Sequence, residues 1–145
     1  MSLDQSLVGR TFPPTAPHSI TDASVAAFAA ATGGAAPDGS VPPTYPIILA
    51  FDAMQAFLDA EQVELQRIVH GEQRFAYARP IASGDTLVAR LTVASLRQIS
   101  GNDIIGTTST FTDQDGAVVC TASATLVHRG PQTDEHQSDE EQEDA

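Results

Sequence analysis

The segment from residue 46 to residue 59 distributes apolar and polar side chains at helical spacing. Pro46 suits the first turn of a helix, and no glycine or proline follows it in the next twelve residues. Asp52, Gln55 and Asp59 fall at i, i+3 and i+7 and form one narrow polar stripe. The remaining surface is mostly apolar and consists of Ile47, Ile48, Phe51, Met54, Phe57 and Leu58. We expect a helix of roughly 20 Å, enclosed by the chain on nearly all sides and too short to span a bilayer.

Downstream of this helix, apolar and polar residues alternate with a period of two, which is typical of β-strands. The predicted strands are 65–79, 86–99, 104–112 and 118–127. A break is expected in the first of them at His70 and Gly71, because glycine weakens a strand. Turn-forming residues at 83–85, 100–102 and 113–116 separate the strands. Such short connections predict antiparallel pairing.

Two further elements are predicted before the central helix. Residues 8–12 are a short strand candidate that ends at two prolines. Thr21 is a suitable N-cap for a second helix, because its hydroxyl can accept from a free backbone N–H of the first turn. An apolar stripe at i, i+3 and i+4 follows, and this helix is expected to end at Gly33 and Gly34. The stripe consists of Val25, Phe28 and Ala29.

This order of elements predicts an α+β domain in which a curved antiparallel sheet wraps a long central helix, the hot-dog fold. Ala122 and Ala124 would leave room for the helix on the inner face of the sheet. An edge strand, either 104–112 or 65–77, would be left without a partner. Pairing that edge across a twofold axis would cover it, so we expect a dimer.

Length and charge divide the chain into a domain and an extension. Residues 1–130 suffice for one domain with a substantial core. The formal net charge is −12, and residues 131–145 carry seven acidic and no basic residues. So few apolar residues cannot offset the entropy lost on folding, and we expect residues 131–145 to form a disordered acidic tail.

The composition excludes several classes of function. The domain has no lysine and no basic cluster, which argues against binding to nucleic acid. Cys120 is the only cysteine, so no internal disulfide or multi-cysteine metal site is possible, and we expect no metal and no cofactor. The N-terminal residues lack the basic and apolar segments of a secretion signal. A cytoplasmic protein without a membrane span is therefore expected.

Several short motifs together resemble the MaoC-like dehydratases, specifically their N-terminal FAS1-like type, as found in subunits of mycolic-acid elongation. The motifs are VGRT at 8–11, FAAATG at 28–33, VPPTYPI at 41–47, HGEQ at 70–73, RPIASGDTL at 79–87 and LVHRG at 126–130. The resemblance covers residues 7–130. It implies a hot-dog fold and the reversible removal of water from a (3R)-hydroxyacyl thioester carried on CoA or acyl carrier protein.

The catalytic motif of that family is incomplete in this chain. Active members carry an Asp and a His in a Gly-Asp-x-Asn-Pro-x-His segment, whereas the matching stretch here places Gly34 at the aspartate position and has no histidine near Gly39. Proton transfer next to a thioester needs a positioned acid or base. We therefore expect that the chain lacks its own catalytic pair, and whether the isolated chain is an enzyme stays open.

Other side chains are candidates for the chemical role of the missing Asp and His. Asp38 precedes a glycine and is more typical of a turn, and His18 is expected to be an exposed loop residue. His70 lies near the expected ligand cleft, although a structural role for it is the simpler interpretation. Cys120 alternates with apolar residues and is expected in the core. His128, at a strand end, has no predicted role.

Noncatalytic members of the family pair with a second hot-dog subunit that carries the Asp and His, and they hold the acyl chain. By this resemblance the central helix and the loop before it would line an acyl tunnel. The expected acyl-binding residues are Pro43, Thr44, Tyr45, Ile47, Ile48, Phe51 and Met54. On any hot-dog helix such apolar residues also serve as ordinary core.

Two other functions remain open at the sequence level. One is a stand-alone hot-dog thioesterase, in which Asp52 would direct water to an acyl thioester. The other is a noncatalytic lipid-binding homodimer. The leading hypothesis is the acyl-binding subunit of a hydroxyacyl-thioester dehydratase, which acts with a catalytic hot-dog partner.

Overall fold

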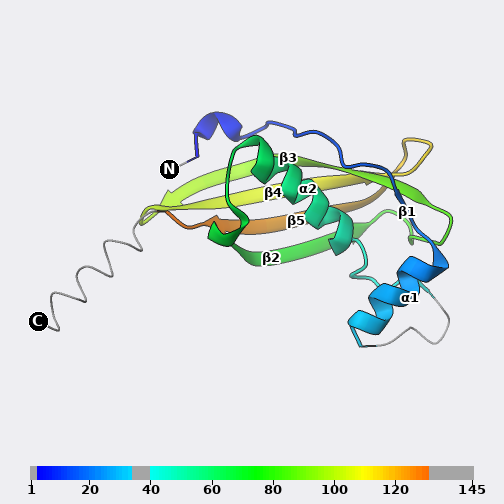
Figure 1. Ribbon diagram of the computed structural model, residues 1–145. Helices are drawn as coiled ribbons and strands as arrows, with labels where there is room; N and C mark the ends of the chain where they lie inside the picture. Colours follow the sequence, from blue (N-terminus) through cyan, green and yellow to red (C-terminus); the bar gives the residue numbers. More distant parts are fainter. Residues whose placement is uncertain (1–2, 34–39, 131–145) are drawn as a thin grey trace, which may run out of the picture.

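The computed structural model of the chain describes residues 3–33 and 40–130 (Figure 1). Its helices and strands are η1 (Gln5–Leu7), β1 (His18–Ser19), α1 (Asp22–Ala31), α2 (Ile47–Ala60), η2 (Leu65–Arg67), β2 (Ile68–Tyr77), β3 (Thr86–Ile99), β4 (Asn102–Thr112) and β5 (Val118–His128). Gly34, Asp38, Gly39 and the acidic tail 131–145 lie outside the described residues. Within the described part, no helix is long and apolar enough to cross a membrane.

The five strands form one antiparallel sheet in the order β1-β3-β4-β5-β2. The sheet is curved, and α2 lies along its inner side, as expected for a hot-dog arrangement (Figure 1). The β3–β4 hairpin closes through Ser100 and Gly101, which have φ values of 53° and 81°. Positive φ at both positions matches the right-handed twist of the flanking strands and keeps the hairpin tight.

The sheet order corrects one expectation about its edges. The strand predicted at 104–112 is β4, which pairs with both β3 and β5 and lies in the centre of the sheet. Two successive tight hairpins give this middle strand a partner on each side. The alternative edge, 65–77, contains β2, which pairs only with β5 among the described strands. The predicted break in this strand is a β-bulge between His70 and Glu72.

The segment 8–12 does not form the predicted strand. After η1 the chain runs along β3, where the Gly9 N–H donates to the Val93 carbonyl (2.8 Å) and the Phe12 N–H donates to the Leu91 carbonyl (2.9 Å). Thr11 forms only an isolated bridge with Thr92. A regular ladder cannot continue because Pro13 and Pro14 have no N–H to donate.

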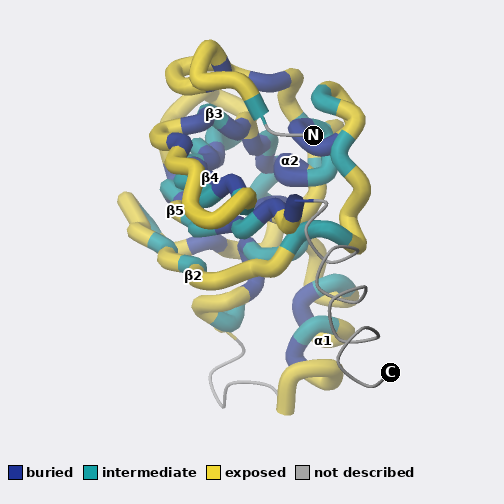
Figure 2. The backbone as a smooth tube through the Cα atoms, turned by 90° about the vertical axis from the view of Figure 1, so that its left-hand side faces the viewer, coloured by how far each residue is buried: buried dark blue, intermediate teal, exposed yellow. Residues whose placement is uncertain are grey.

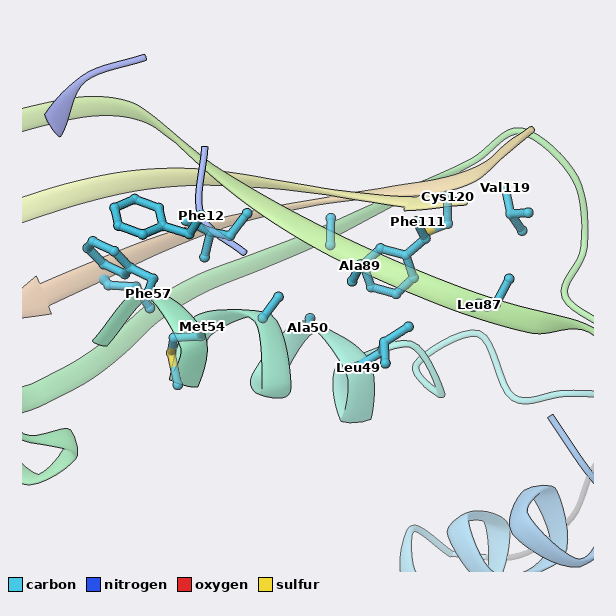
Figure 3. Packing of buried hydrophobic residues seen from close by; sticks show 14 of the residues in the cluster. Phe12, Leu49, Ala50, Met54, Phe57, Leu87, Ala89, Phe111, Val119 and Cys120 are labelled. Atoms are coloured by element: carbon cyan, nitrogen blue, oxygen red, sulfur yellow. The ribbon is translucent and has the colours of Figure 1, made fainter. Parts of the chain in front are cut away.

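Helix α2 packs one face against the sheet and leaves the opposite face open. Figure 3 shows Met54 and Phe57 of α2 in the buried hydrophobic cluster. Figure 2 shows that α2 and the strands contain buried residues. Phe57 is fully buried, and its ring meets that of Phe12 edge-on at 4.8 Å. By contrast, Asp52 and Asp59 on the opposite face are exposed, and Phe51, at the border of the packed face, is 45% exposed. The expectation that α2 is enclosed on nearly all sides is wrong for this chain, because a single curved sheet covers only one side of a helix.

Candidate functional site

A small cavity lies between α2 and the edge strand β2. Its lining is mainly apolar and consists of Ile47, Ala50, Phe51, Met54, His70, Gln73, Leu91, Thr107, Ser109, Ala122, Ala124 and Leu126. Its volume is about 70 Å³. Ala122 and Ala124, the residues expected to leave room for the helix, contribute to the floor. The cavity exists because these inward positions of β5 carry only methyl groups.

His70 and Gln73 form the polar rim of this cavity. The Gln73 Nε2 donates to the backbone carbonyls of Arg74 (3.3 Å) and Ser123 (3.2 Å), which orients the amide oxygen toward His70. His70 Nε2 lies 3.0 Å from Gln73 Oε1. An amide oxygen only accepts, so Nε2 carries a proton. No carboxylate among the described residues contacts His70, so this histidine has no acidic partner to orient it for proton transfer.

The structure separates the seven residues that the resemblance assigned to acyl binding. Ile47, Phe51 and Met54 line the cavity. Pro43 lies at a second hollow, Thr44 is exposed, and Tyr45 is buried in the core. Ile48 is partly buried against the core and is not part of the lining of either hollow. Asp52, the thioesterase candidate, is exposed on α2 and is not part of the lining of the cavity either.

A second hollow of about 380 Å³ lies where the chain enters α2. It is lined by residues 40–43 and 77–81. The Tyr77 hydroxyl donates to the Pro43 carbonyl and so joins the end of β2 to the segment before α2. Burial raises the pKa of Tyr77 to about 12. The phenol therefore stays protonated at neutral pH and keeps this hydrogen bond.

Arg79 fixes the loop between β2 and β3 on the other side of this hollow. Its guanidinium donates to both carboxylate oxygens of Asp85 (2.9 and 3.2 Å) and to Asp113 (3.0 Å). These hydrogen bonds lower the pKa of both Asp85 and Asp113. Asp113 also accepts from the N–H groups of Asp115 and Ala117, which orders the β4–β5 turn. Arg79 is therefore a clamp that holds two loops together.

This clamp should make part of the stability depend on pH. Because the pKa values of Asp85 and Asp113 are lowered, their contribution is present above the ordinary aspartate pKa, about 3.9, and is lost as the pH falls through the lowered values. Replacing Arg79 by methionine should lower the free energy of unfolding at pH 7, and the difference from wild type should shrink toward pH 3. Urea unfolding across this range measures it.

The matched control for the clamp is Arg74→Met, since Arg74 is exposed and pairs only with the exposed Glu72 among the described residues. That variant should follow the wild-type pH profile. A stability difference between wild type and Arg79→Met that stays constant down to pH 3 would show that the clamp does not act through these two carboxylates.

His18 is not the exposed loop residue that was expected. It lies in β1, partly buried, and its Nε2 is 2.9 Å from the Tyr45 hydroxyl. The Tyr45 hydroxyl is also 2.8 Å from Ser24 Oγ, which itself donates to the Thr21 carbonyl. Thr21 forms the predicted N-cap of α1, as its hydroxyl accepts from the Ser24 N–H. The network joins α1 to the start of α2, so His18 and Tyr45 have a structural role.

Sequence reasoning missed a buried pair between Asp103 and His128. His128 Nδ1 lies 3.0 Å from Asp103 Oδ2, which also accepts from the Leu3 N–H (3.1 Å). Asp103 and His128 face each other across β4 and β5 at the end of the sheet, and both are at least nine-tenths buried. Neither belongs to the lining of the cavity. The pair holds the N-terminal segment and has no access to a substrate.

Cys120 is fully buried in the core, as expected. Burial raises the pKa of its thiol, so the thiolate is disfavoured and a role as nucleophile is not supported. Over residues 3–33 and 40–130, no three or more His, Cys, Asp or Glu side chains are grouped so that they could hold a metal ion.

Comparison with known proteins identifies the family. The family model described as the FAS1-like dehydratase domain region matches residues 6–122 of the chain. The chain belongs to this FAS1-like dehydratase family. A UPF0336 protein of Streptomyces coelicolor is 37% identical to it over 89% of this chain and 97% of its own length. A UPF0336 protein of Saccharopolyspora erythraea is 35% identical, over 92% and 96% of the two chains.

Solved structures place this FAS1-like member among the MaoC-like hot-dog dehydratases, as the sequence motifs indicated. The HadBC (3R)-hydroxyacyl-ACP dehydratase complex of Mycobacterium tuberculosis contains a chain with a TM-score of 0.71 and 26% identity. The match covers 83% of this chain and 96% of that one. HtdX of Mycobacterium tuberculosis matches with a TM-score of 0.68 and 26% identity, over 83% and 51% of the two chains. The α+β hot-dog fold is thereby confirmed.

Proposed function

We propose that this FAS1-like protein is the acyl-chain-binding component of a (3R)-hydroxyacyl-thioester dehydratase and that it acts with a second, catalytic hot-dog subunit. One observation carries the proposal: the apolar cavity between α2 and β2 has His70 as its only titratable lining residue, and no described carboxylate orients His70. Such a cavity can hold the end of a hydrocarbon chain, whereas elimination of water needs a positioned acid or base. The substrate would be an acyl thioester of CoA or of acyl carrier protein.

The described surface is consistent with a partner on the open side of α2. Strand β2 pairs on one side only among the described strands, so its outer backbone groups are available to another strand. Phe51 on α2 lines the cavity and is 45% exposed. A second hot-dog subunit that paired with β2 on the side of α2 would cover the edge of the sheet and Phe51 together. The free edge of β2 and the exposed apolar side chain of Phe51 support a dimer, and we propose that the second subunit is the catalytic one.

Mixing experiments test the proposal. The purified chain alone should not hydrate trans-2-enoyl-CoA above the buffer rate. With a hot-dog subunit that carries the Asp and His, it should form a 1:1 complex and raise the rate of that subunit at least 10²-fold, because the acyl chain is then held in position. The loss of enoyl-thioester absorbance measures the rate, and native mass spectrometry measures the stoichiometry.

The control uses the same complex with the catalytic aspartate of the partner replaced by asparagine, which should abolish the rate and leave the complex intact. Turnover by the isolated chain at a normal rate would contradict the noncatalytic assignment. A stable homodimer that carries bound acyl material and joins no catalytic subunit would favour the lipid-binding alternative. Loss of thioester hydrolysis in an Asp52→Asn variant would favour the thioesterase instead.

A further inference from the structure

Two hydroxyl groups face the cavity from the inner side of β4. Thr107 and Ser109 are each 4% exposed, and both belong to the cavity lining. On β5 they pair with Ala124 and Ala122, whose side chains are single methyl groups. Thr107 and Ser109 therefore share the floor of the cavity with small side chains.

Within the described part of the chain, neither hydroxyl bonds to another residue, and both oxygens stay accessible from the cavity, since no sealed side-chain N or O atom there lacks a partner. The other two buried polar side chains, Asp103 and His128, bond to each other. Each hydroxyl can therefore bond to whatever small polar group occupies the cavity, whether water or a ligand atom. A ligand that displaces the water must supply a polar atom there or lose those hydrogen bonds.

The lining also limits what that atom can be. His70 at the rim is the only titratable residue of the lining, so a carboxylate, phosphate or ammonium group would meet no opposite fixed charge deep in the cavity. Hydroxyl groups both donate and accept, which suits a neutral alcohol or carbonyl. A cavity of about 70 Å³ holds a fragment of about three heavy atoms, since an apolar cavity of about 150 Å³ holds one benzene.

We infer that this cavity accepts the oxygenated tip of an acyl chain, a neutral hydroxyl that Thr107 and Ser109 bind while Ile47, Ala50 and Met54 enclose the last carbons. The inference rests on the proposed acyl-binding function and adds a substrate class to it: acyl thioesters with an oxygen near the end of the chain. The cavity should prefer an acyl chain that ends in a hydroxyl over one that ends in a methyl group, because the methyl group would leave both hydroxyls of the floor without a partner.

The test compares two series of thioesters on the full chain by isothermal titration calorimetry. One series is ω-hydroxybutanoyl-, ω-hydroxyhexanoyl- and ω-hydroxyoctanoyl-CoA, and the other has the same acyl groups without the hydroxyl. At one length or more, the hydroxylated ligand should bind about tenfold tighter, the effect of about one net hydrogen bond. The double variant Thr107→Val/Ser109→Ala should lose this preference and bind the unsubstituted ligand better.

The matched control is Thr108→Val, the same substitution on the same strand but with the side chain on the outer face of the sheet, and it should keep the preference. Equal affinity of the two series for wild type, as expected if the hydroxyls hold only water, would overturn the inference and leave the acyl-binding function intact. A preference that persists in the double variant would overturn it as well. If neither series binds, the proposed function fails together with the inference.

A second readout does not depend on the variants. In wild-type protein the amide NMR signals of Thr107 and Ser109 should shift differently with the hydroxylated and the unsubstituted ligand, while those of Thr108 should respond equally to both. Identical shifts of Thr107 and Ser109 with the two ligands would show that the floor does not contact the end of the chain.

Discussion

Replacing Phe57 by alanine is expected to lower the free energy of unfolding by about 3–5 kcal/mol, the usual cost of removing a buried aromatic ring. Phe57 is fully buried on α2, and its ring packs edge-on against Phe12 at 4.8 Å. The substitution would leave a cavity between α2 and the segment that runs along β3. Since domains of this size are stable by about 5–15 kcal/mol, most of the stability would be lost. Urea unfolding followed by circular dichroism measures the change.

Phe51→Ala is the matched control, because it makes the same change on the same helix at a position that is 45% exposed. It should alter the stability of the isolated chain by less than about 1 kcal/mol. Since Phe51 lines the cavity, this variant should instead weaken the binding of acyl ligands. Equal destabilisation by the two substitutions would mean that the open face of α2 is covered in solution even without a partner.

Replacing Asp103 by alanine is the second change with a large expected effect, a loss of about 1–3 kcal/mol, the usual cost of leaving buried donors without an acceptor. Asp103 accepts hydrogen bonds from His128 Nδ1, the Leu3 N–H and Gln98 Nε2, at 3.0 to 3.1 Å. The Leu3 N–H and His128 Nδ1 would lose this acceptor, with His128 only 6% exposed, whereas Gln98 Nε2 would keep its bond to the Leu3 carbonyl. The N-terminal segment should also become easier to cleave by proteases, which limited proteolysis can measure.

Two comparisons make this result specific. Glu72→Ala removes a carboxylate from the exposed pair with Arg74 and should cost less than about 1 kcal/mol. The double variant Asp103→Ala/His128→Ala should be more stable than the sum of the single losses implies, by about 0.5–3 kcal/mol, since the two side chains interact directly. Additive losses would show that Asp103 acts mainly through Leu3 and Gln98.

The periodicity of the sequence was sufficient for the individual elements. The alternating residues 86–99 match β3 (Thr86–Ile99), and the helix predicted from Pro46 is α2 (Ile47–Ala60). Thr21 caps α1 as predicted. These features are local, because a strand, a helix or a cap depends on side chains that are close together in the sequence. The prediction of a strand at residues 8–12 was wrong. This segment is held by contacts with β3, which is distant in the sequence, and the two prolines that follow prevent a regular ladder.

The candidate site was predicted only in part. Ile47, Phe51 and Met54 line the cavity, since the helical period places them on one side of α2, and their contact with an acyl chain stays a prediction. Tyr45 was assigned to the ligand as well, yet it is buried and joins His18 to Ser24. The polar floor at Thr107 and Ser109 was not anticipated, because alternation marks these positions as inward-facing but does not say what lies opposite them.

The amino-acid sequence alone determined the α+β class, the central helix and the strand pattern, since each of these depends on the spacing of residues that are close together in the chain. Only the tertiary structure decided that β4 is central, that α2 has an open face, that Asp103 meets His128, and that a small cavity with two free hydroxyls lies beneath α2. These properties depend on which distant strands pair and how far the sheet curves, and both are settled by packing across the whole domain.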